Sequence, residues 1–139
     1  IEDPFRIFTV VRQEATLFCD TLRNNLTMYQ DVPDEKLTGL LCSLGLAKYA
    51  SPAALNEMVL EGGSNFSGGE KKRFCLARAL LRDTPVLLCD EPLANLDSDT
   101  AQKIESLLLS IPEKTLVVVS HQCSEENLQA FDRVIDFGG

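Results

Sequence analysis

Apolar side chains along this chain recur in two patterns, one typical of amphipathic helices and one typical of buried strands. The helical pattern is clearest in the first half, where leucines recur every three or four residues: Leu37, Leu40, Leu41 and Leu44. Asp34 precedes this run and is the expected N-cap, and Gly45 follows it as a natural helix stop. The spacing predicts one helix between these two residues.

Two further helices and one loop are expected downstream. One helix opens at Ser67 and runs to about Arg82. Another begins after Asp97, with Pro112 beyond its end, and it carries its apolar residues on one face: Ala101, Ile104 and Leu108. Residues 51–66 are rich in glycine, serine and asparagine, and this composition predicts a loop.

Short apolar runs at four places predict strands: Thr9–Val11, Val86–Cys89, Leu116–Val119 and Val134–Phe137. The second and third runs are apolar throughout, which is the pattern of parallel strands buried on both faces. Strands that alternate with helices indicate an α/β fold with a mainly parallel sheet.

The composition excludes several function classes. A net charge of −8 argues against a nucleic-acid surface, which would be basic. The only concentrated positive charge is Lys71–Arg73, continued by Arg78 and Arg82, and the default expectation for it is a solvated helix face. The five cysteines form no CxxC pair, which favours reduced thiols over a metal site or disulfides. No apolar run reaches the length of about 18 residues that a membrane span requires.

The stretch Ser67–Glu70 is the first candidate for chemistry. Ser67 and Glu70 have the spacing of a capping box, in which each side chain accepts a hydrogen bond from the backbone N–H of the other residue. The two glycines between them carry no side chains, so an anion could approach the first amides of the helix. A plain capped helix after a flexible loop is the competing interpretation of this stretch alone.

Asp90 and Glu91 end a predicted buried strand, at the sheet edge where ligands bind in open α/β folds. Adjacent acids at such an edge could divide two tasks. Asp90 suits a Mg²⁺ site beside phosphate oxygens and waters, and Glu91 suits a general base. His121 and Gln13 each follow a predicted strand, and either one alone would carry little weight.

The order of these features resembles the ATP-binding cassette (ABC) ATPase family over nearly the whole chain. Gln13 matches the family's Q-loop, Phe66–Glu70 its signature motif and Val86–Asp90 its Walker B strand. Glu91 stands in the place of the catalytic glutamate, Ala94–Asp97 looks like the D-loop, and His121 looks like the switch histidine.

The stretches Val11–Phe18, Thr21–Asn25 and Glu61–Gly63 are similar to segments of exporter-type members. The chain departs from the family pattern at four positions: Arg12, Leu60, Phe66 and Glu70. Glu70 stands where glutamine is commoner, and none of the four departures removes a catalytic group.

The resemblance implies a pair of domains joined head to tail around two ATP molecules. Ser67, Gly68 and Gly69 would contact the γ-phosphate of ATP held by the opposite domain, with Glu70 and Asp97 in the same cofactor-binding set. Asp90 would hold Mg²⁺ through water, and Glu91 would polarise the attacking water. His121 would contact the γ-phosphate, and Gln13 would link metal and water to the membrane domain.

The resemblance also implies a P-loop NTPase (RecA-like) fold, here a partial parallel-sheet core with an inserted α-helical subdomain. We expect residues 1–14 to hold the Q-loop strand, 15–83 the helical subdomain, and 84–139 the Walker B, D-loop and H-loop part. The expected partners are a second ABC domain and a transmembrane domain, without nucleic acid. The expected location is the cytoplasmic face of the cell membrane.

A Walker A loop requires the pattern G-x-x-x-x-G-K-[ST], which holds the phosphates. The nearest match is Gly63–Gly68, but Gly69 and Glu70 follow where lysine and serine or threonine are required. We therefore expect this segment alone not to hydrolyse ATP, although the intact protein would be an ATPase that powers transport, with export as the expected direction. A soluble ABC ATPase of DNA repair or translation and a non-catalytic interaction fragment remain alternatives.

The family topology places a P-loop strand between the strands that begin near Leu116 and Val134. Without it, the Leu116–Val119 strand would have an unpaired edge, which can pair with another chain. We expect either Val134–Phe137 to pair with this edge or two copies to associate through it.

Overall fold

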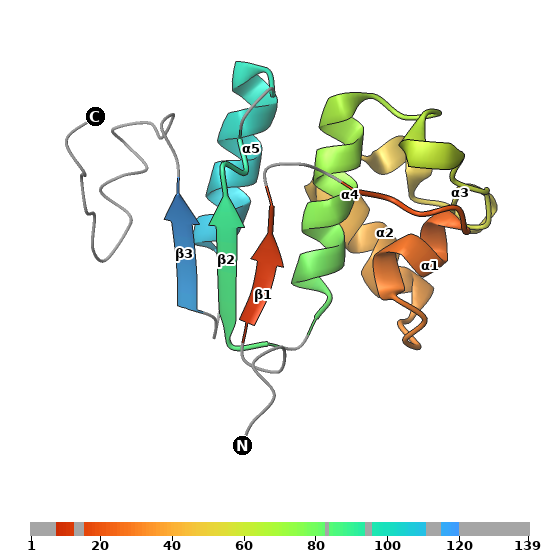
Figure 1. Cartoon of the computed structure of the whole chain (residues 1–139), viewed down its shortest axis with the longest axis horizontal. Coiled ribbons are helices and arrows are strands. Elements are labelled where there is room, and N and C mark those ends of the chain that lie inside the picture. Colours follow the sequence, from red (N-terminus) through yellow and green to blue (C-terminus); the bar gives the residue numbers. More distant parts are fainter. Residues whose placement is uncertain (1–7, 13–15, 83, 94–95, 111–114, 120–139) are drawn as a thin grey trace.

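Three short strands form a parallel sheet at one end of the molecule, and β2 lies in the middle of it (Figure 1). The structure is a computed structural model that describes residues 8–12, 16–82, 84–93, 96–110 and 115–119. β1 (Phe8–Val11) pairs with β2 (Val86–Asp90) so that Phe8 lies beside Val86. β2 pairs in turn with β3 (Thr115–Val119), with Val86 beside Thr115. The parallel sheet expected from the alternation of strands and helices is present.

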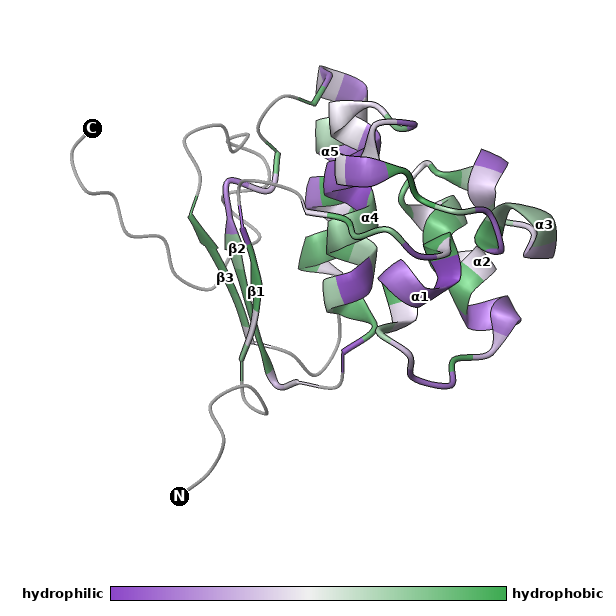
Figure 2. Ribbon diagram, turned by 45° about the vertical axis from the view of Figure 1, so that its right-hand side comes forward, coloured by the Kyte–Doolittle hydropathy of each residue, from purple (hydrophilic) through white to green (hydrophobic). Residues whose placement is uncertain are grey.

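One face of the sheet is covered by helices. Figure 2 shows the sheet nearly edge-on, with α4 (Gly68–Leu80) and α5 (Ser98–Leu109) on the same side of it. Leu87 and Cys89 point to this side and are fully buried in the same apolar core as Ile104 of α5. This burial explains the alternation along β2, because successive side chains of a strand point to opposite faces.

The opposite face of the sheet carries exposed apolar side chains. Phe8 is 46% exposed, Val10 49%, Val117 43% and Val119 51%. The expectation that Val86–Cys89 and Leu116–Val119 would be buried on both faces is therefore wrong for the described part of the chain. A run of apolar residues shows that a strand suits burial, but burial also requires an element that packs on each face.

The helical region packs around a core of its own. It contains α1 (Leu22–Thr27), α2 (Asp34–Ser43), α3 (Pro52–Leu55) and α4, with 3₁₀-helical turns at Ala47–Tyr49 and Glu61–Gly63. Its fully buried side chains are mostly leucines: Leu22, Leu26, Leu37, Leu41, Leu44, Leu46, Leu55 and Phe74. This core joins segments that are far apart in sequence, since α1 contacts α4 and α3.

Two local predictions need correction. Asp34 is the first residue of α2 rather than its cap, because Pro33 occupies the N-cap position without a side-chain hydrogen bond. The Asp34 carboxylate instead forms an ion pair with the guanidinium of Arg23. The segment 51–66 is not loop throughout, because Ser51 caps α3 by accepting a hydrogen bond from the Ala54 N–H.

Other boundaries follow the sequence closely. Gly45 has a φ of +75°, a conformation that favours glycine, and it follows the last turn of α2. Asp97 caps α5 through a 3.0 Å hydrogen bond from the Thr100 N–H. The predicted strand Val134–Phe137 lies outside the described residues, so its pairing with β3 stays a prediction. In the part of the chain that the structure describes, no helix has the length and apolar character needed to cross a bilayer.

Candidate functional site: the start of the signature helix and the acidic end of β2

The start of α4 is built as a complete capping box. Ser67 Oγ accepts a hydrogen bond from the Glu70 N–H at 3.1 Å, and Glu70 Oε1 accepts one from the Ser67 N–H at 2.9 Å. Both bonds are reciprocal across one helical turn, so they fix the direction in which α4 begins. The capping box predicted from the Ser-x-x-Glu spacing is confirmed.

The two glycines between these residues leave the first turn open. Ser67 and Gly68 are exposed, and a Cβ built on Gly68 would meet no atom within 4 Å. A Cβ on Gly69 would lie 3.3 Å from the Leu96 side chain, which is a tight contact. The helix start thus offers backbone N–H groups on an open surface at Gly68, while Gly69 packs closely against the segment that leads into α5.

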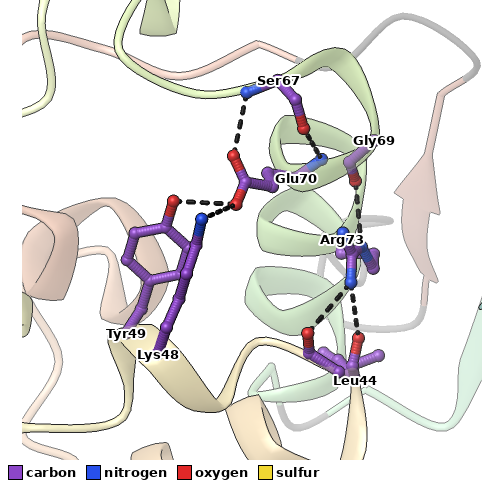
Figure 3. Close-up of polar contacts among 8 residues, drawn as sticks. Leu44, Lys48, Tyr49, Ser67, Gly69, Glu70 and Arg73 are labelled. Atoms are coloured by element: carbon purple, nitrogen blue, oxygen red, sulfur yellow. Dashed lines mark hydrogen bonds and ion pairs between the residues drawn. The ribbon is translucent and has the colours of Figure 1, made fainter.

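The Glu70 carboxylate has a second set of partners on its other oxygen (Figure 3). Oε2 accepts a 2.8 Å hydrogen bond from the Tyr49 hydroxyl and lies 3.0 Å from Lys48 Nζ. Burial acts to raise the pKa of Glu70, but the Ser67 N–H, the Tyr49 hydroxyl and Lys48 outweigh it and lower the pKa to about 2. The carboxylate is therefore ionised across the whole physiological pH range.

Tyr49 is held in place by two phenylalanine rings. Its ring packs edge-on against Phe66, with centroids 5.4 Å apart, and against Phe74, with centroids 5.1 Å apart. Phe66 and Phe74 also pack against each other at 4.9 Å. Because Phe66 precedes the capping box and Phe74 lies on α4, this three-ring cluster fixes the Tyr49 hydroxyl relative to the start of the helix.

The default expectation of a solvated basic face is wrong for Lys72, Arg73 and Arg78, whereas Arg82 is exposed as expected. Lys72 is only 6% exposed. The guanidinium of Arg73 donates hydrogen bonds to the backbone oxygens of Leu44 and Gly45 at the end of α2, at 3.2 and 3.1 Å (Figure 3).

Arg78 likewise makes structural contacts. Its guanidinium donates to the backbone oxygen of Asn25 at 2.7 Å and to that of Thr16 at 3.0 Å. These cations therefore bind α4 to the rest of the helical region instead of facing solvent.

The acid pair lies at the carboxyl end of β2, the edge predicted for ligands. Asp90 is exposed, whereas Glu91 is half-buried and its Oε1 atom is shielded from solvent. Glu91 has a φ of +49°, and its N–H donates a 2.8 Å hydrogen bond to the Val119 oxygen of β3. This backbone turn separates the environments of the two neighbouring carboxylates, as two different tasks would require.

Lys72 brings the signature helix into electrostatic contact with this acid pair. Burial lowers the pKa of Lys72, while the negative charges of Glu91 and Asp90 act in the opposite direction. The helix that begins with the signature motif therefore also contributes to the charge balance at the end of β2.

Two of the candidate residues, Gln13 and His121, lie outside the described residues, as do Ala94 and Asn95 of the D-loop segment. Asp97 is described: its carboxylate caps α5, and this hydrogen bond from Thr100 lowers its pKa. The structure brings together Ser67, Gly68, Gly69 and Glu70 on one helix turn, with Leu96 packed against Gly69. Asp90 and Glu91 form the second group.

Tyr49, Lys48 and Lys72 are members of these groups that the sequence pattern did not identify. Tyr49 and Lys48 are about twenty residues from Glu70, so no local spacing indicates their contact. A weak signal did exist, since a glutamate in place of the commoner glutamine adds a charge that a folded protein has to solvate or pair.

The comparison with protein families matches this arrangement. The sequence profile of the ABC transporter family matches residues 3–94, which is well over half of the chain. The chain belongs to the ABC transporter family. Membership confirms the family resemblance and the α/β P-loop NTPase fold class that the sequence predicted.

Several ABC transporters align with almost all of the chain. The glutathione/L-cysteine transport system ATP-binding/permease protein CydC of Escherichia coli K12 is 41% identical over 129 residues, covering 91% of this chain and 22% of that protein. The ATP-dependent lipid A-core flippase of Neisseria gonorrhoeae is 33% identical over 138 residues, covering 95% of this chain and 22% of that protein.

A solved structure agrees as well. The chain is similar to a bacterial Atm1-family ABC exporter with ATP bound, with a TM-score of 0.73 and 29% sequence identity. The match covers 84% of this chain and 21% of the exporter chain. The chain thus spans about a fifth of the length of these relatives.

Proposed function

We propose that this chain is part of the ATP-binding and ATP-hydrolysing domain of an ABC exporter, which couples ATP hydrolysis to the movement of a substrate out across a membrane. The main support is the start of α4: a capping box with exposed Ser67 and Gly68, and with open space at Gly68. The names of the relatives favour a transporter over a soluble ABC ATPase of DNA repair or translation, since they include an ATP-binding/permease protein and an exporter.

The start of α4 fits the γ-phosphate of ATP held by a second ABC domain. The N–H groups of Gly68 and Gly69 lie at the positive end of the helix dipole, and the Ser67 hydroxyl lies beside them. Ser67, Gly68 and Gly69 would bind phosphate oxygens there, and Asp97 would fix the neighbouring D-loop by capping α5. In this proposal Glu70 supports the site by accepting the Ser67 N–H in the capping box.

The acids at the end of β2 fit the metal and water side of the reaction. Asp90 is exposed at the strand end and would hold Mg²⁺ through water, a ligand arrangement that this ion favours. Mg²⁺ neutralises charge on the phosphates when it is bound. Glu91 is less exposed and would take a proton from the attacking water, while His121 and Gln13 would contact the γ-phosphate and the metal.

The proposal extends to the parts of the protein and their partners. Residues 1–14 would carry the Q-loop strand, 15–83 the helical subdomain, and 84–139 the Walker B, D-loop and H-loop part. The partners would be a second ABC domain, joined head to tail, and a transmembrane domain, with the ABC domains at the cytoplasmic face. We also propose that this segment alone does not turn over ATP, since its sequence contains no Walker A pattern.

Two substitutions in the complete polypeptide test the assigned roles. Glu91→Gln keeps the side-chain shape but removes the proton acceptor, so hydrolysis is expected to fall about a hundredfold or more while ATP binding persists. Ser67→Arg is expected to block closure of the domain pair, because its side chain would fill the open space at the helix start. Glu35→Gln, at an exposed site on α2, is the matched control and is expected to keep normal turnover.

ATPase rates and nucleotide binding are measured for all three variants. Near-normal turnover by Glu91→Gln would contradict the general-base role. For the isolated segment, calorimetric titration with MgATP is expected to show no micromolar affinity, and tight binding would contradict the proposed dependence on a Walker A loop.

A further inference from the structure

Glu70 places a negative charge in the first turn of α4. The proposed function assigns this same helix start to the binding of a phosphate. The Glu70 carboxylate lies within one turn of the Gly68 and Gly69 amides, on the same helix start. The negative charges of the Glu70 carboxylate and a bound phosphate would repel each other. The positive end of the helix dipole, which attracts the phosphate, also attracts this carboxylate. A glutamate here therefore needs a device that keeps its charge from competing with the phosphate.

The two oxygens of the carboxylate have separate partners. Oε1 accepts the Ser67 N–H, which completes the capping box. Oε2 takes no part in the box and is bound by the Tyr49 hydroxyl and the Lys48 ammonium (Figure 3). Helix capping alone requires only the first contact, so the contacts to Oε2 need a different explanation.

These contacts hold the carboxylate on the side of α4 that faces the segment Ala47–Tyr49. The Tyr49 ring is fixed by Phe66 and Phe74, so its hydroxyl is a rigid donor. Lys48 supplies the compensating charge, and its own side chain stays 70% exposed, while that of Glu70 is only 13% exposed. The pairing leaves the ionised glutamate largely shielded from solvent with its charge compensated, and the lysine in contact with solvent.

We propose that Tyr49 and Lys48 are positioning residues for the signature motif, which hold the Glu70 carboxylate back from the Gly68 and Gly69 amides and cancel its charge there. This proposal rests on the proposed function, because it takes the phosphate of ATP as the ligand of those amides. It predicts that Lys48 matters for ATP only when position 70 carries a charge.

The test is a set of single and double variants of the complete polypeptide, measured by steady-state ATPase kinetics. Lys48→Met removes the charge and keeps the length of the side chain. It is expected to raise KM for ATP about threefold in the natural background and to lower kcat less. In the Glu70→Gln background the same substitution is expected to change KM by less than about 1.5-fold, since no carboxylate charge remains.

Tyr49→Phe separates the hydroxyl from the ring. It keeps the packing against Phe66 and Phe74, so the protein stays folded, and it is expected to raise KM about twofold to threefold, again only when Glu70 is present. Tyr29→Phe is the matched control, because the Tyr29 hydroxyl also donates to a carboxylate, but to that of Asp20 and not to Glu70. Its KM is expected to equal that of the unmodified protein.

Ionic strength supplies a readout that a purely structural role would not move. The effect of Lys48→Met on KM is expected to shrink as salt rises from about 0.05 to 0.5 M, because salt screens exposed charges. An equal change in KM in both backgrounds, or no change beside Glu70, would overturn the proposal. The proposed function fails separately: it is wrong if Glu91→Gln and Ser67→Arg both leave turnover normal, whatever the Lys48 variants show.

Discussion

The helical region and the sheet differ in how completely their apolar side chains are packed. In the helical region, α1 to α4 enclose leucines and Phe74 that have almost no exposed surface. In the sheet, one face is covered by α4 and α5 (Figure 2), and the other exposes four apolar side chains: Phe8, Val10, Val117 and Val119. The helical region therefore carries its own core, while the described part of the sheet is packed on one side only.

The difference extends to the two groups of candidate site residues. The start of α4 is fixed by partners within the helical region: the capping box, Tyr49, Lys48 and the aromatic cluster. The acids at the end of β2 depend on a strand that has only one packed face. The first group is expected to keep its geometry through local contacts, whereas the geometry of the second depends on whatever the sheet as a whole is packed against.

The largest expected loss of stability is at Phe74 in the helical region, and Phe8 in the sheet is the matched comparison. Phe74→Ala would empty a fully buried site and is expected to cost about 3–5 kcal/mol of unfolding free energy. Phe8→Ala removes the same side chain from the exposed sheet face and is expected to cost less than about 1 kcal/mol. Urea denaturation of both variants checks the comparison, and equal losses would show that the two regions are packed alike.

Asn25 offers a test of the polar connections of the helical region. It is fully buried, and its amide accepts from the Phe18 N–H at 2.9 Å and donates to the Phe18 and Thr21 oxygens. Asn25→Ala leaves these backbone groups without their partner and is expected to cost about 2–3 kcal/mol.

Asn24→Ala is the control for this variant, because the amide of Asn24 bonds only to the Asp20 side chain among the described residues. Its expected cost is below about 1 kcal/mol. Thermal unfolding curves for the two variants give the comparison, and a larger loss at Asn24 would contradict the role assigned to Asn25.

Removing the N-cap of α4 or of α5 tests the same comparison with a smaller expected loss of stability. Ser67→Ala removes the cap of α4, and Asp97→Ala removes the cap of α5; each is expected to cost about 1 kcal/mol. Hydrogen exchange of the first-turn amides locates the loss. Ser67→Ala should increase exchange at the start of α4 only modestly, because Tyr49 and Lys48 still hold Glu70. Equal fraying at both helices would argue against that support.

The smallest effect is expected on the open face of the sheet. Val117→Thr places a hydroxyl where the side chain is already 43% exposed, so the expected change in unfolding free energy is within about 0.5 kcal/mol. Val11→Thr makes the same replacement on the buried face, where the side chain is 4% exposed, and it is expected to cost about 1–3 kcal/mol. A large loss at Val117 in the complete polypeptide would show that this face is covered there.

The sequence predicted those features that depend on neighbours within a few residues. The capping box at Ser67 and the Asp97 cap follow from spacing alone, and so do the strands at Val86 and Leu116. The acid pair could be placed at a sheet edge because the strand ends there. In each case the cause lies within one or two turns of the chain.

The features that the sequence missed depend on contacts between distant segments. The Asp34 carboxylate pairs with Arg23 instead of capping α2, and the Arg73 guanidinium binds the end of α2 instead of facing solvent. The short helix α3 was missed although a local signal was present, since Ser51 followed by proline is a common helix start. The bare face of β3 could not be predicted, because local sequence does not say what packs against a strand.

At Glu91 the backbone conformation that costs stability occurs at the residue whose carboxylate is proposed to act as the general base. A φ of +49° suits glycine, and any other residue there costs about 1 kcal/mol or more. Replacement by glycine would relieve this strain and remove the carboxylate at the same time. A library selected only for heat resistance would therefore tend to accumulate glycine at position 91, whereas selection for the proposed ATP hydrolysis would retain glutamate.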